Sequence, residues 1–382
     1  MSEEIINLRM PATSFKGKKA KIKVIGVGGG GGNAINHMVK STLKEVDFIA
    51  VNTDAQDLSR NEAPYLAQIG EKLTRGLGVG GDPVKGRAAA EESEARLREY
   101  ISPCDLLFIT AGMGGGTGTG AAPYIAKLAK DMLGDNVLVV GVVTRPFNAE
   151  GYRREQFAEA GIQEMQKYAD TMIIIPNEKI FSVVSAHTTQ REAYAMVDEV
   201  LLRAVRGISE VITQEGEMNI DFNDVLAVMR HSKRALIGIG EASGHNRHLL
   251  AMRQAIMSPL LENADVRGAK GFIVNIASCG DLAAKEQQEA MAVISEYANS
   301  DSVIKFGTSA DPELDGKVRV TAIAAGLSEE NANAMTIRQS RPLSERGFAK
   351  KPQHEDSFDE NRKSFGEDRL IPAILRRKPR IK

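Results

Sequence analysis

The feature that most constrains the fold of this chain is a run of six glycines within the nine residues 112–120. A short apolar stretch at 106–109 precedes it, and apolar residues at helical spacing follow it between positions 121 and 132. Glycine lets a backbone turn with positive φ and lie close to a ligand. At the amino end of a helix, the loop amides and the helix dipole favour a phosphate chain. The sequence therefore predicts a nucleotide-binding loop rather than a flexible linker.

A similar pattern lies near the amino end of the chain. The apolar strand predicted over 21–27 runs into five glycines and Asn33, followed by helical spacing over 34–39. Gly26, Gly28 and Gly31 match the dinucleotide fingerprint, and Asp54 follows an apolar stretch as the acidic residue of an NAD site does. An NAD-dependent oxidoreductase is therefore one alternative, but it leaves the second glycine loop unexplained. Two phosphate loops fit a nucleoside triphosphate better.

Strands and helices alternate along the first half of the chain. This order indicates an α/β fold with an open parallel, Rossmann-like sheet whose ligand site lies at the carboxyl ends of the strands. A third glycine-rich turn at 76–83 is equally compatible with an ordinary surface loop. We expect strands over 48–52, 136–144 and 172–175, one helix over 84–99, a long central helix over 188–214, and a smaller second α/β domain with strands over 235–239, 271–277, 303–308 and 318–325 and helices over 249–261 and 282–298.

Charge and cysteine content exclude several classes of protein. The formal net charge of −1 divides into +6 from Arg338 onward and −7 before it, so the body lacks the basic excess of a nucleic-acid-binding surface, and we expect no direct nucleic-acid partner. Cys104 and Cys279 have no metal-ligand spacing and are expected to be buried free thiols in a reducing compartment. No apolar stretch is long enough for a transmembrane segment and no signal peptide is visible.

Seven segments of the chain agree in order and spacing with one known family of proteins. They are 26–34, 52–56, 76–78, 112–122, 143–147, 219–224 and 258–262. Together they resemble the tubulin/FtsZ superfamily of GTPases, and within it the FtsZ family of bacterial cell division, from about residue 22 to residue 327. The resemblance implies GTP or GDP as the bound nucleotide, Mg²⁺ as its cofactor, and head-to-tail assembly with further copies of the chain.

Carried over residue by residue, the resemblance implies a guanine-nucleotide site. The two glycine loops would hold the phosphates, Glu150 and Arg154 the ribose and phosphate edge, and Tyr194 would stack on the base. Asp198 would accept hydrogen bonds from guanine N–H groups, which adenine cannot offer there. By spacing alone, core packing is the alternative for Tyr194. The metal ligands stay unassigned, and the full binding set is Gly29, Gly30, Gly31, Gly32, Asn33, Gly114, Gly115, Gly116, Thr117, Gly118, Thr119, Glu150, Arg154, Asn177, Tyr194 and Asp198.

The catalytic residues implied by the resemblance are Asn219, Asp221 and Asp224. They follow the central helix, far along the chain from the glycine loops. The resemblance implies that they enter the nucleotide site of the next subunit, where the carboxylates orient the attacking water. Without the family, two aspartates at this spacing before an apolar helix are more simply helix N-terminal charges.

Two segments depart from the family pattern. Residues 82–85 read Asp-Pro-Val-Lys where an Asn-Pro-Glu form is typical, so the residues that sense the γ-phosphate stay unassigned. The basic cluster from Arg230 to Arg234 stands where the family usually has small and apolar residues, one of them a glycine. A solvated helix face explains that cluster, and a place at the filament contact is the alternative.

The resemblance also implies the division of the chain and its cellular role. We expect a GTP-dependent cytoskeletal filament that forms the septal ring, in the cytoplasm at the inner face of the membrane. A tubulin-like plasmid-segregation filament is the alternative. The segment from Leu370 to Arg377 is similar to the peptide by which the FtsZ family binds membrane tethers and other division proteins. A plasmid-segregation filament needs no such docking peptide. The expected parts are a flexible arm (1–19), a GTPase domain (20–187), the central helix (188–214), the water-positioning loop with the carboxy-terminal α/β domain (215–327), a disordered linker (328–366) and the docking peptide (367–382).

Overall fold

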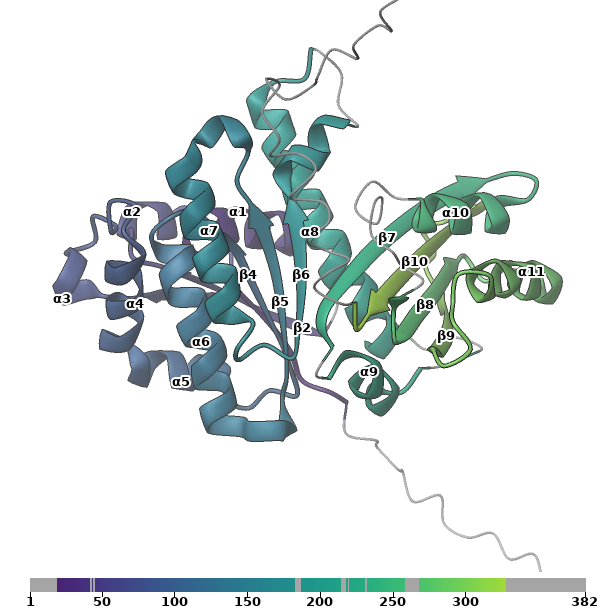
Figure 1. The fold of residues 1–382 in the computed structure, drawn as a ribbon, viewed down its shortest axis with the longest axis horizontal. Coiled ribbons are helices and arrows are strands. Elements are labelled where there is room, and N and C mark those ends of the chain that lie inside the picture. Colours follow the sequence, from purple (N-terminus) through teal and green to yellow (C-terminus); the bar gives the residue numbers. More distant parts are fainter. Residues whose placement is uncertain are drawn as a thin grey trace, which may run out of the picture. The chain divides into compact units, whose positions relative to one another are not determined.

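The computed structural model describes residues 19–41, 43, 45–182, 187–213, 218, 220–230, 232–257 and 268–327. Within them, one ten-stranded sheet has the order β3-β2-β1-β4-β5-β6-β7-β10-β8-β9 (Figure 1). Its first six strands are all parallel. They are β1 (Ile22–Val27), β2 (Val46–Asn52), β3 (Tyr65–Gln68), β4 (Leu106–Gly112), β5 (Leu138–Arg145) and β6 (Thr171–Pro176).

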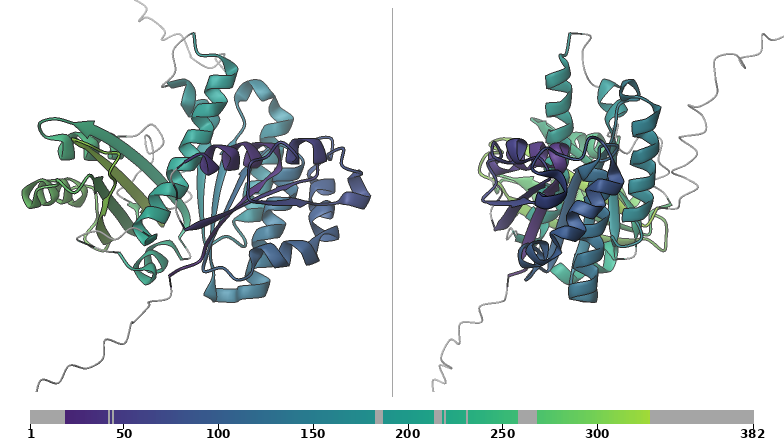
Figure 2. Two further views of the ribbon diagram at one scale, coloured as in Figure 1. Left: turned by 180° about the vertical axis from the view of Figure 1, so that it is seen from behind. Right: turned by 90° about the vertical axis from the view of Figure 1, so that its left-hand side faces the viewer.

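Helices cover both faces of the parallel strands, as their continuous apolar sequences require. The core on one face joins these strands to α1 (Gly28–Val39) and α8 (Gln190–Thr213). The second core, on the other face, contains α4 (Pro83–Glu92), α5 (Glu94–Ile101), α6 (Thr117–Leu133) and α7 (Tyr152–Met165). Figure 2 shows these two layers from behind and from the side. The layered α/β fold expected from the sequence is confirmed.

The strands that follow α8 continue the same sheet in a mixed arrangement. β7 (Lys233–Ser243) pairs parallel to β6, while β10 (Lys317–Ala325) lies antiparallel between β7 and β8 (Gly271–Ser278). β9 (Val303–Ala310) forms the edge beside β8. A third core packs these strands against α10 (Arg247–Ile256) and α11 (Ala284–Ser295). The carboxy-terminal strands therefore extend the nucleotide-binding sheet instead of forming a separate one.

The helix predicted over 84–99 is two helices, because the backbone leaves helical geometry at Ser93. The Ser93 hydroxyl accepts a hydrogen bond from the Gly70 amide at 2.9 Å, a tertiary contact that competes with the helix. Three short elements in this region carry no pattern that the sequence analysis used. They are α2 (Ala55–Leu58), β3 and α3 (Glu71–Thr74).

The first predicted glycine loop, over 28–33, is helical throughout, and the second is shorter than expected, because a helix begins within each glycine run. Helix α1 starts at Gly28 and α6 starts at Thr117, so only residues 113–116 separate β4 from α6. Short 3-10 turns, which were not expected, follow α6, β5 and β6: Gly134–Asn136, Asn148–Glu150 and Asn177–Ser182.

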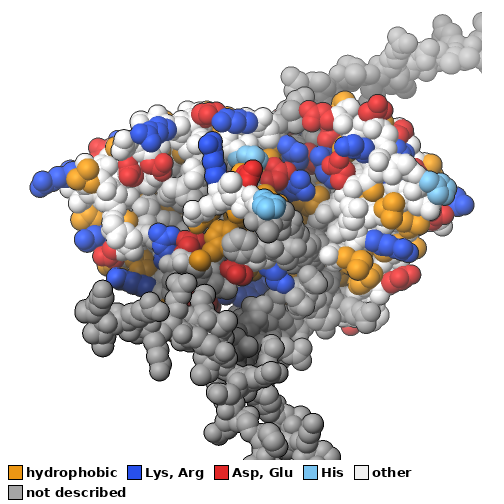
Figure 3. Space-filling model, turned by 90° about the horizontal axis from the view of Figure 1, so that it is seen from above, with side chains coloured by type: hydrophobic (Ala, Val, Ile, Leu, Met, Phe, Trp, Pro, Cys, Tyr) orange, Lys and Arg blue, Asp and Glu red, His pale blue; other side chains and the backbone are white. Residues whose placement is uncertain are grey.

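The prediction of two buried thiols is wrong for one of them. Cys104 is buried, and burial raises the pKa of its thiol to about 12. Cys279 is exposed because it follows the last residue of β8 and precedes Gly280, which turns the chain with a φ of +95°. On the face in Figure 3, charged side chains of both signs are interspersed over the described surface.

Candidate functional site

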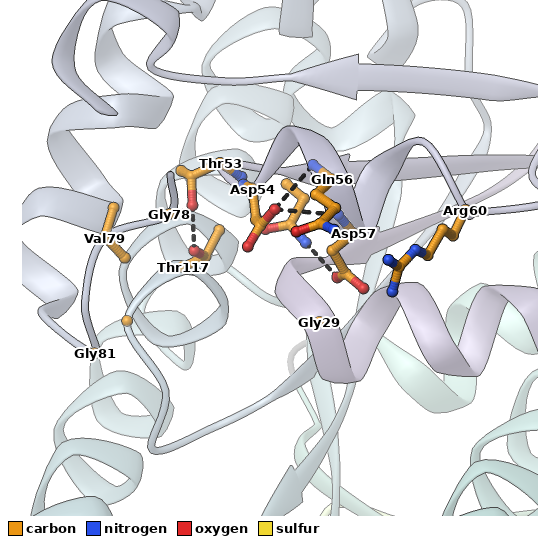
Figure 4. Close-up of a pocket in the computed structure, with 12 residues that line it drawn as sticks. Gly29, Thr53, Asp54, Gln56, Asp57, Arg60, Gly78, Val79, Gly81 and Thr117 are labelled. Carbon is orange, nitrogen blue, oxygen red and sulfur yellow. Dashed lines mark hydrogen bonds between the residues drawn. The ribbon is translucent and has the colours of Figure 1, made fainter. Parts of the chain in front are cut away.

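A cavity of about 390 Å³ lies where β2 ends and α1 and α6 begin (Figure 4). Parallel α/β sheets bind ligands at this edge, beyond the carboxyl ends of their strands. Three separate glycine-containing segments contribute to the cavity wall. Its lining residues are Gly29, Asn52, Thr53, Asp54, Gln56, Asp57, Arg60, Gly78, Val79, Gly81, Gly116 and Thr117.

Polar side chains after β2 hold one side of the cavity. Asp54 caps α2 by accepting hydrogen bonds from the amides of Gln56 and Asp57, at 2.9 and 3.1 Å. The Asp57 carboxylate accepts a hydrogen bond from the Asn52 amide group at 2.7 Å. The hydroxyl oxygens of Thr53 and Thr117 are 2.7 Å apart, which joins this wall to the start of α6.

The first glycine run serves both the cavity and the packing of α1. Gly29 lines the cavity and Gly30 is exposed next to it. Gly31 and Gly32 are buried, and a Cβ on Gly31 would lie 2.5 Å from the Thr110 carbonyl oxygen. Gly31 therefore lets α1 approach β1 and β4, which aims the amino end of α1 at the cavity, while Asn33 is exposed.

The second glycine run is divided in the same way. The Gly114 amide donates to the Thr119 hydroxyl of α6 at 2.8 Å, so this amide of the predicted phosphate loop already has a partner within the chain. Gly118 is buried, with the Gly112 carbonyl oxygen 2.8 Å from where its Cβ would lie. Only Gly116 and Thr117 of this run line the cavity, and partly exposed Gly115 stands before them.

The glycine-rich turn at 76–83 is part of the cavity wall and not a remote surface loop. Gly78, Val79 and Gly81 line the cavity, and both glycines have positive φ. Asp82 ends the turn by capping α4, accepting from the Val84 amide at 2.9 Å, with Pro83 at the first helical position. Sequence analysis assigned no role to the lining residues Asp57, Arg60 and Val79. Their only signal was their place next to segments that resemble the family.

The residues expected around ribose and base are not among those that line this cavity. Glu150 pairs with Arg154 and accepts from the Phe147 amide at 2.9 Å. Tyr194 is half-buried, with its ring edge-on to Phe147 at 5.3 Å between centroids. Burial, with Glu150 nearby, raises the pKa of Tyr194.

Two of the predicted nucleotide-binding residues, Asn177 and Asp198, carry acceptor oxygens on side chains that are at least partly buried. Asn177, at the start of the turn after β6, is buried, and its Oδ1 has no hydrogen-bond partner among the described residues. Asp198 lies on α8, where burial raises its pKa from 3.8 to about 7, although His37 opposes the shift. A ligand with N–H groups would satisfy both the Asn177 oxygen and the Asp198 carboxylate.

The predicted catalytic aspartates lie at the amino end of α9 (Phe222–Met229). Asp221 caps this helix by accepting from the Asp224 amide at 2.7 Å, so the helix-terminus interpretation from sequence describes its local structure. Asp224 is in the first turn, with its Oδ1 2.6 Å from the Lys305 Nζ. Asn219 lies outside the described residues.

The cavity lies at the carboxyl ends of the parallel strands, and α9 lies at the opposite end of the sheet, near their amino ends. The glycine loops follow the carboxyl ends of parallel strands, whereas α9 leads into the start of β7, and β7 pairs with the first residues of β6. The Thr171 hydroxyl, in the first residue of β6, contacts the Met229 carbonyl. Helix α8 runs between these two ends of the sheet, and its 24 residues span about 36 Å at about 1.5 Å each.

Comparison with known proteins identifies the family. Residues 21–185 match the model described as Tubulin/FtsZ family, GTPase domain, and residues 233–328 match FtsZ family, C-terminal domain. An empty FtsZ dimer from M. jannaschii is similar at 40% identity, with 82% of this chain and 90% of that chain covered and a TM-score of 0.77. The chain belongs to the tubulin/FtsZ family. A point variant of FtsZ from the same organism is similar at 41% identity, covering 81% of this chain and 92% of that one, with a TM-score of 0.76.

Family membership makes the chain a GTPase that binds guanine nucleotides, and the NAD-dependent alternative is wrong. The CetZ2 protofilament with bound GTPγS, from Haloferax volcanii, is similar at 22% identity, covering 84% of this chain and all of that one, with a TM-score of 0.69. At that identity the likeness concerns the fold.

Two further properties bear on ligands and membranes. Among the described residues, no three or more His, Cys, Asp or Glu side chains are grouped as a metal site. Within the same residues, no helix combines the length and hydropathy needed to cross a bilayer.

Proposed function

We propose that this GTPase forms head-to-tail filaments that build the septal ring of bacterial cell division, on the cytoplasmic side of the membrane. The FtsZ family match over both halves of the chain supports this role over plasmid segregation. Self-association has support from the M. jannaschii relative, whose structure is a dimer.

The observation that carries the proposal is the separation of the cavity from the two aspartates. Gly29, Gly116 and Thr117 line the cavity at the carboxyl ends of the parallel strands. Asp221 and Asp224 lie at the other end of the sheet, and α8 runs between the two ends. Side chains are far too short to bridge such a separation. In a head-to-tail stack of identical subunits, however, the end of one subunit that carries α9 faces the end of the next subunit that carries the cavity. Hydrolysis is then completed by the neighbour.

Within the cavity, each group has a distinct task. Gly29, Gly116 and the amino ends of α1 and α6 present amides that would bind the phosphates. Mg²⁺ prefers hard oxygen ligands, and the oxygens of Thr53, Asp54 and Thr117 at the cavity wall fit it. When bound, Mg²⁺ neutralises developing phosphate charge.

Guanine would be bound by the remaining predicted residues. Asn177 and Asp198 offer the acceptor oxygens that its N–H groups require, and Tyr194 offers an aromatic surface. Glu150 and Arg154 would contact the ribose and the phosphate edge.

The aspartates of the neighbour would act on water. Asp221 Oδ1 and Asp224 Oδ1 are engaged within their own subunit, which leaves Oδ2 of each to accept a hydrogen bond from the attacking water. A carboxylate in that position orients the water and takes up its proton. Asn219 is proposed to assist from the same loop.

Replacement of Asp224 by Ala tests this mechanism. We expect GTP affinity to be unchanged and turnover to fall about a hundredfold, in the range that a general base contributes. Wild-type turnover per molecule should also rise with protein concentration before it levels. The control Asp131→Ala alters an exposed aspartate of α6 and should retain full activity. Loss of GTP binding in Asp224→Ala, or a turnover per molecule independent of concentration, would show that the site is complete within one subunit.

A further inference from the structure

The segment before α9 is attached to the edge strand β9. The Thr308 amide donates to the Met218 carbonyl at 2.9 Å, and the Met218 amide donates to the Thr308 hydroxyl at 3.1 Å. Two residues on, Ile220 packs over Gly307, where a Cβ would lie 3.0 Å from its Cγ1. The path of the segment is thus set by β9 before α9 begins.

Lys305 continues this line of contacts at Asp224. Its Nζ is 2.6 Å from Asp224 Oδ1, and each side chain is about one-third exposed, at 33% and 32%. Successive side chains alternate between the faces of a strand, so Lys305 and Gly307 share the face that the segment crosses. Phe306 points to the other face, where it joins the core with α10 and α11. The lysine is therefore mounted on a packed strand.

The contact engages only one of the two carboxylate oxygens. The shortest contact between the Lys305 ammonium and the carboxylate is at Oδ1, and within the described part of the chain no hydrogen bond to Asp224 Oδ2 is formed. A carboxylate fixed at one oxygen keeps a defined direction for the other. Without the lysine, the Asp224 side chain would sample several rotamers at an exposed helix start.

We propose that Lys305 is a positioning residue, which fixes the Asp224 carboxylate in the direction needed to orient water in the next subunit's site. The inference rests on the proposed function, because it assigns Lys305 a role only if Asp224 acts there. An ion pair this exposed contributes little to stability, so its main effect is on the carboxylate's geometry. Loss of alignment at a reacting group lowers the rate even when binding is intact.

The test compares Lys305→Met, Lys305→Arg, Asp224→Ala and the double variant Lys305→Met/Asp224→Ala in the full chain. Turnover is measured per subunit in sedimented polymer, and GTP affinity is measured on unassembled protein. We expect Lys305→Met to lose about tenfold in turnover with affinity unchanged, within the range that misplacement costs. Lys305→Arg should recover most of the rate, and the double variant should match Asp224→Ala.

Lys317→Met is the control, because Lys317 also forms a lysine–carboxylate ion pair on a carboxy-terminal strand, with Glu241 between β10 and β7, at a more exposed position. It should turn over GTP at the wild-type rate. Should Lys305→Met fail to fold, Lys305→Gln takes its place. Wild-type turnover in Lys305→Met, alongside loss in Asp224→Ala, overturns the positioning role alone, and so does a double variant slower than Asp224→Ala. Full activity in Asp224→Ala overturns the proposed function itself.

Discussion

The charge of the Asp198 carboxyl group depends on its burial and on whether a hydrogen-bond donor lies beside it. Burial on α8 raises its pKa from 3.8 to about 7, so ionising it costs folding stability as the pH rises through that interval. Guanine N–H groups would stabilise the ionised form. Nucleotide binding should therefore release a proton near neutral pH.

We expect guanine-nucleotide affinity to fall about tenfold between pH 8 and pH 6, because an acid with a pKa of about 7 is mostly protonated at the lower pH. Calorimetry in buffers of different ionisation enthalpy would measure the released proton. Asp198→Asn is the control, and it leaves only the titration of the phosphates. If Asp198→Asn and the wild type show the same pH profile, Asp198 does not bind the base.

Lys233 has a φ of +54°, a region that favours glycine. It is exposed at the start of β7, while neighbouring Arg230 donates to the Asp135 carbonyl at 2.5 Å. Lys233→Gly should raise the free energy of unfolding by up to about 1 kcal/mol, since a left-handed non-glycine residue is strained by about that amount. Chemical denaturation would measure it. Lys317→Gly, in a strand without positive φ, should lose stability instead, and equal effects would argue against backbone strain.

At the scale of elements, close packing fixes α8 against the carboxy-terminal strands. A Cβ on Gly207 of α8 would lie 2.4 Å from the Thr321 Cγ2 of β10. The helix can approach the strand this closely only because position 207 has no side chain. The contact joins α8, which runs between the two ends of the sheet, to the antiparallel strand β10.

Gly207→Ala should destabilise the chain by about 1–3 kcal/mol, the range for overpacking a core. Thermal unfolding would measure the loss. Combining it with Thr321→Ser, which removes the clashing methyl group, should recover part of the stability. The interpretation fails if the double variant is no more stable than Gly207→Ala.

Element boundaries show how far sequence patterns reach. The apolar stretches predicted most strands to within a few residues, because burial on both faces leaves a continuous signal. Neither the start of α1 at Gly28 nor the break at Ser93 was predictable. The break at Ser93 follows from a tertiary contact with the Gly70 amide, which no local pattern records.

The candidate site was predictable in part for the same reason. Glycine runs indicated phosphate loops, but spacing could not separate Gly29, which lines the cavity, from Gly31, which packs α1. Arg60 and Val79 carry no motif of their own and reach the cavity only through the path of the chain. The roles given to Asp221 and Asp224 depend on the family resemblance, since their local geometry is that of a helix start.

For the molecule as a whole, the proposed docking peptide at 370–377 lies outside the described residues. Truncation before Arg369 should leave GTP-driven assembly in solution nearly unchanged and abolish recruitment to the division site, because a short peptide binds a partner's groove through few apolar side chains. Sedimentation and fluorescence microscopy would measure the two effects. Replacing Ile374 and Leu375 with Ser keeps every charge. Normal recruitment of that variant would mean that basic residues alone suffice on anionic lipid.

The continuity of the sheet has a mechanical consequence. β6 and β7 pair at three positions only, whereas β7 and β10 pair at nine. A pull that separates the two halves of the subunit therefore meets its weakest strand pairing at residues 171–173 and 233–235. Under force, the protein should yield at this join before either half unravels.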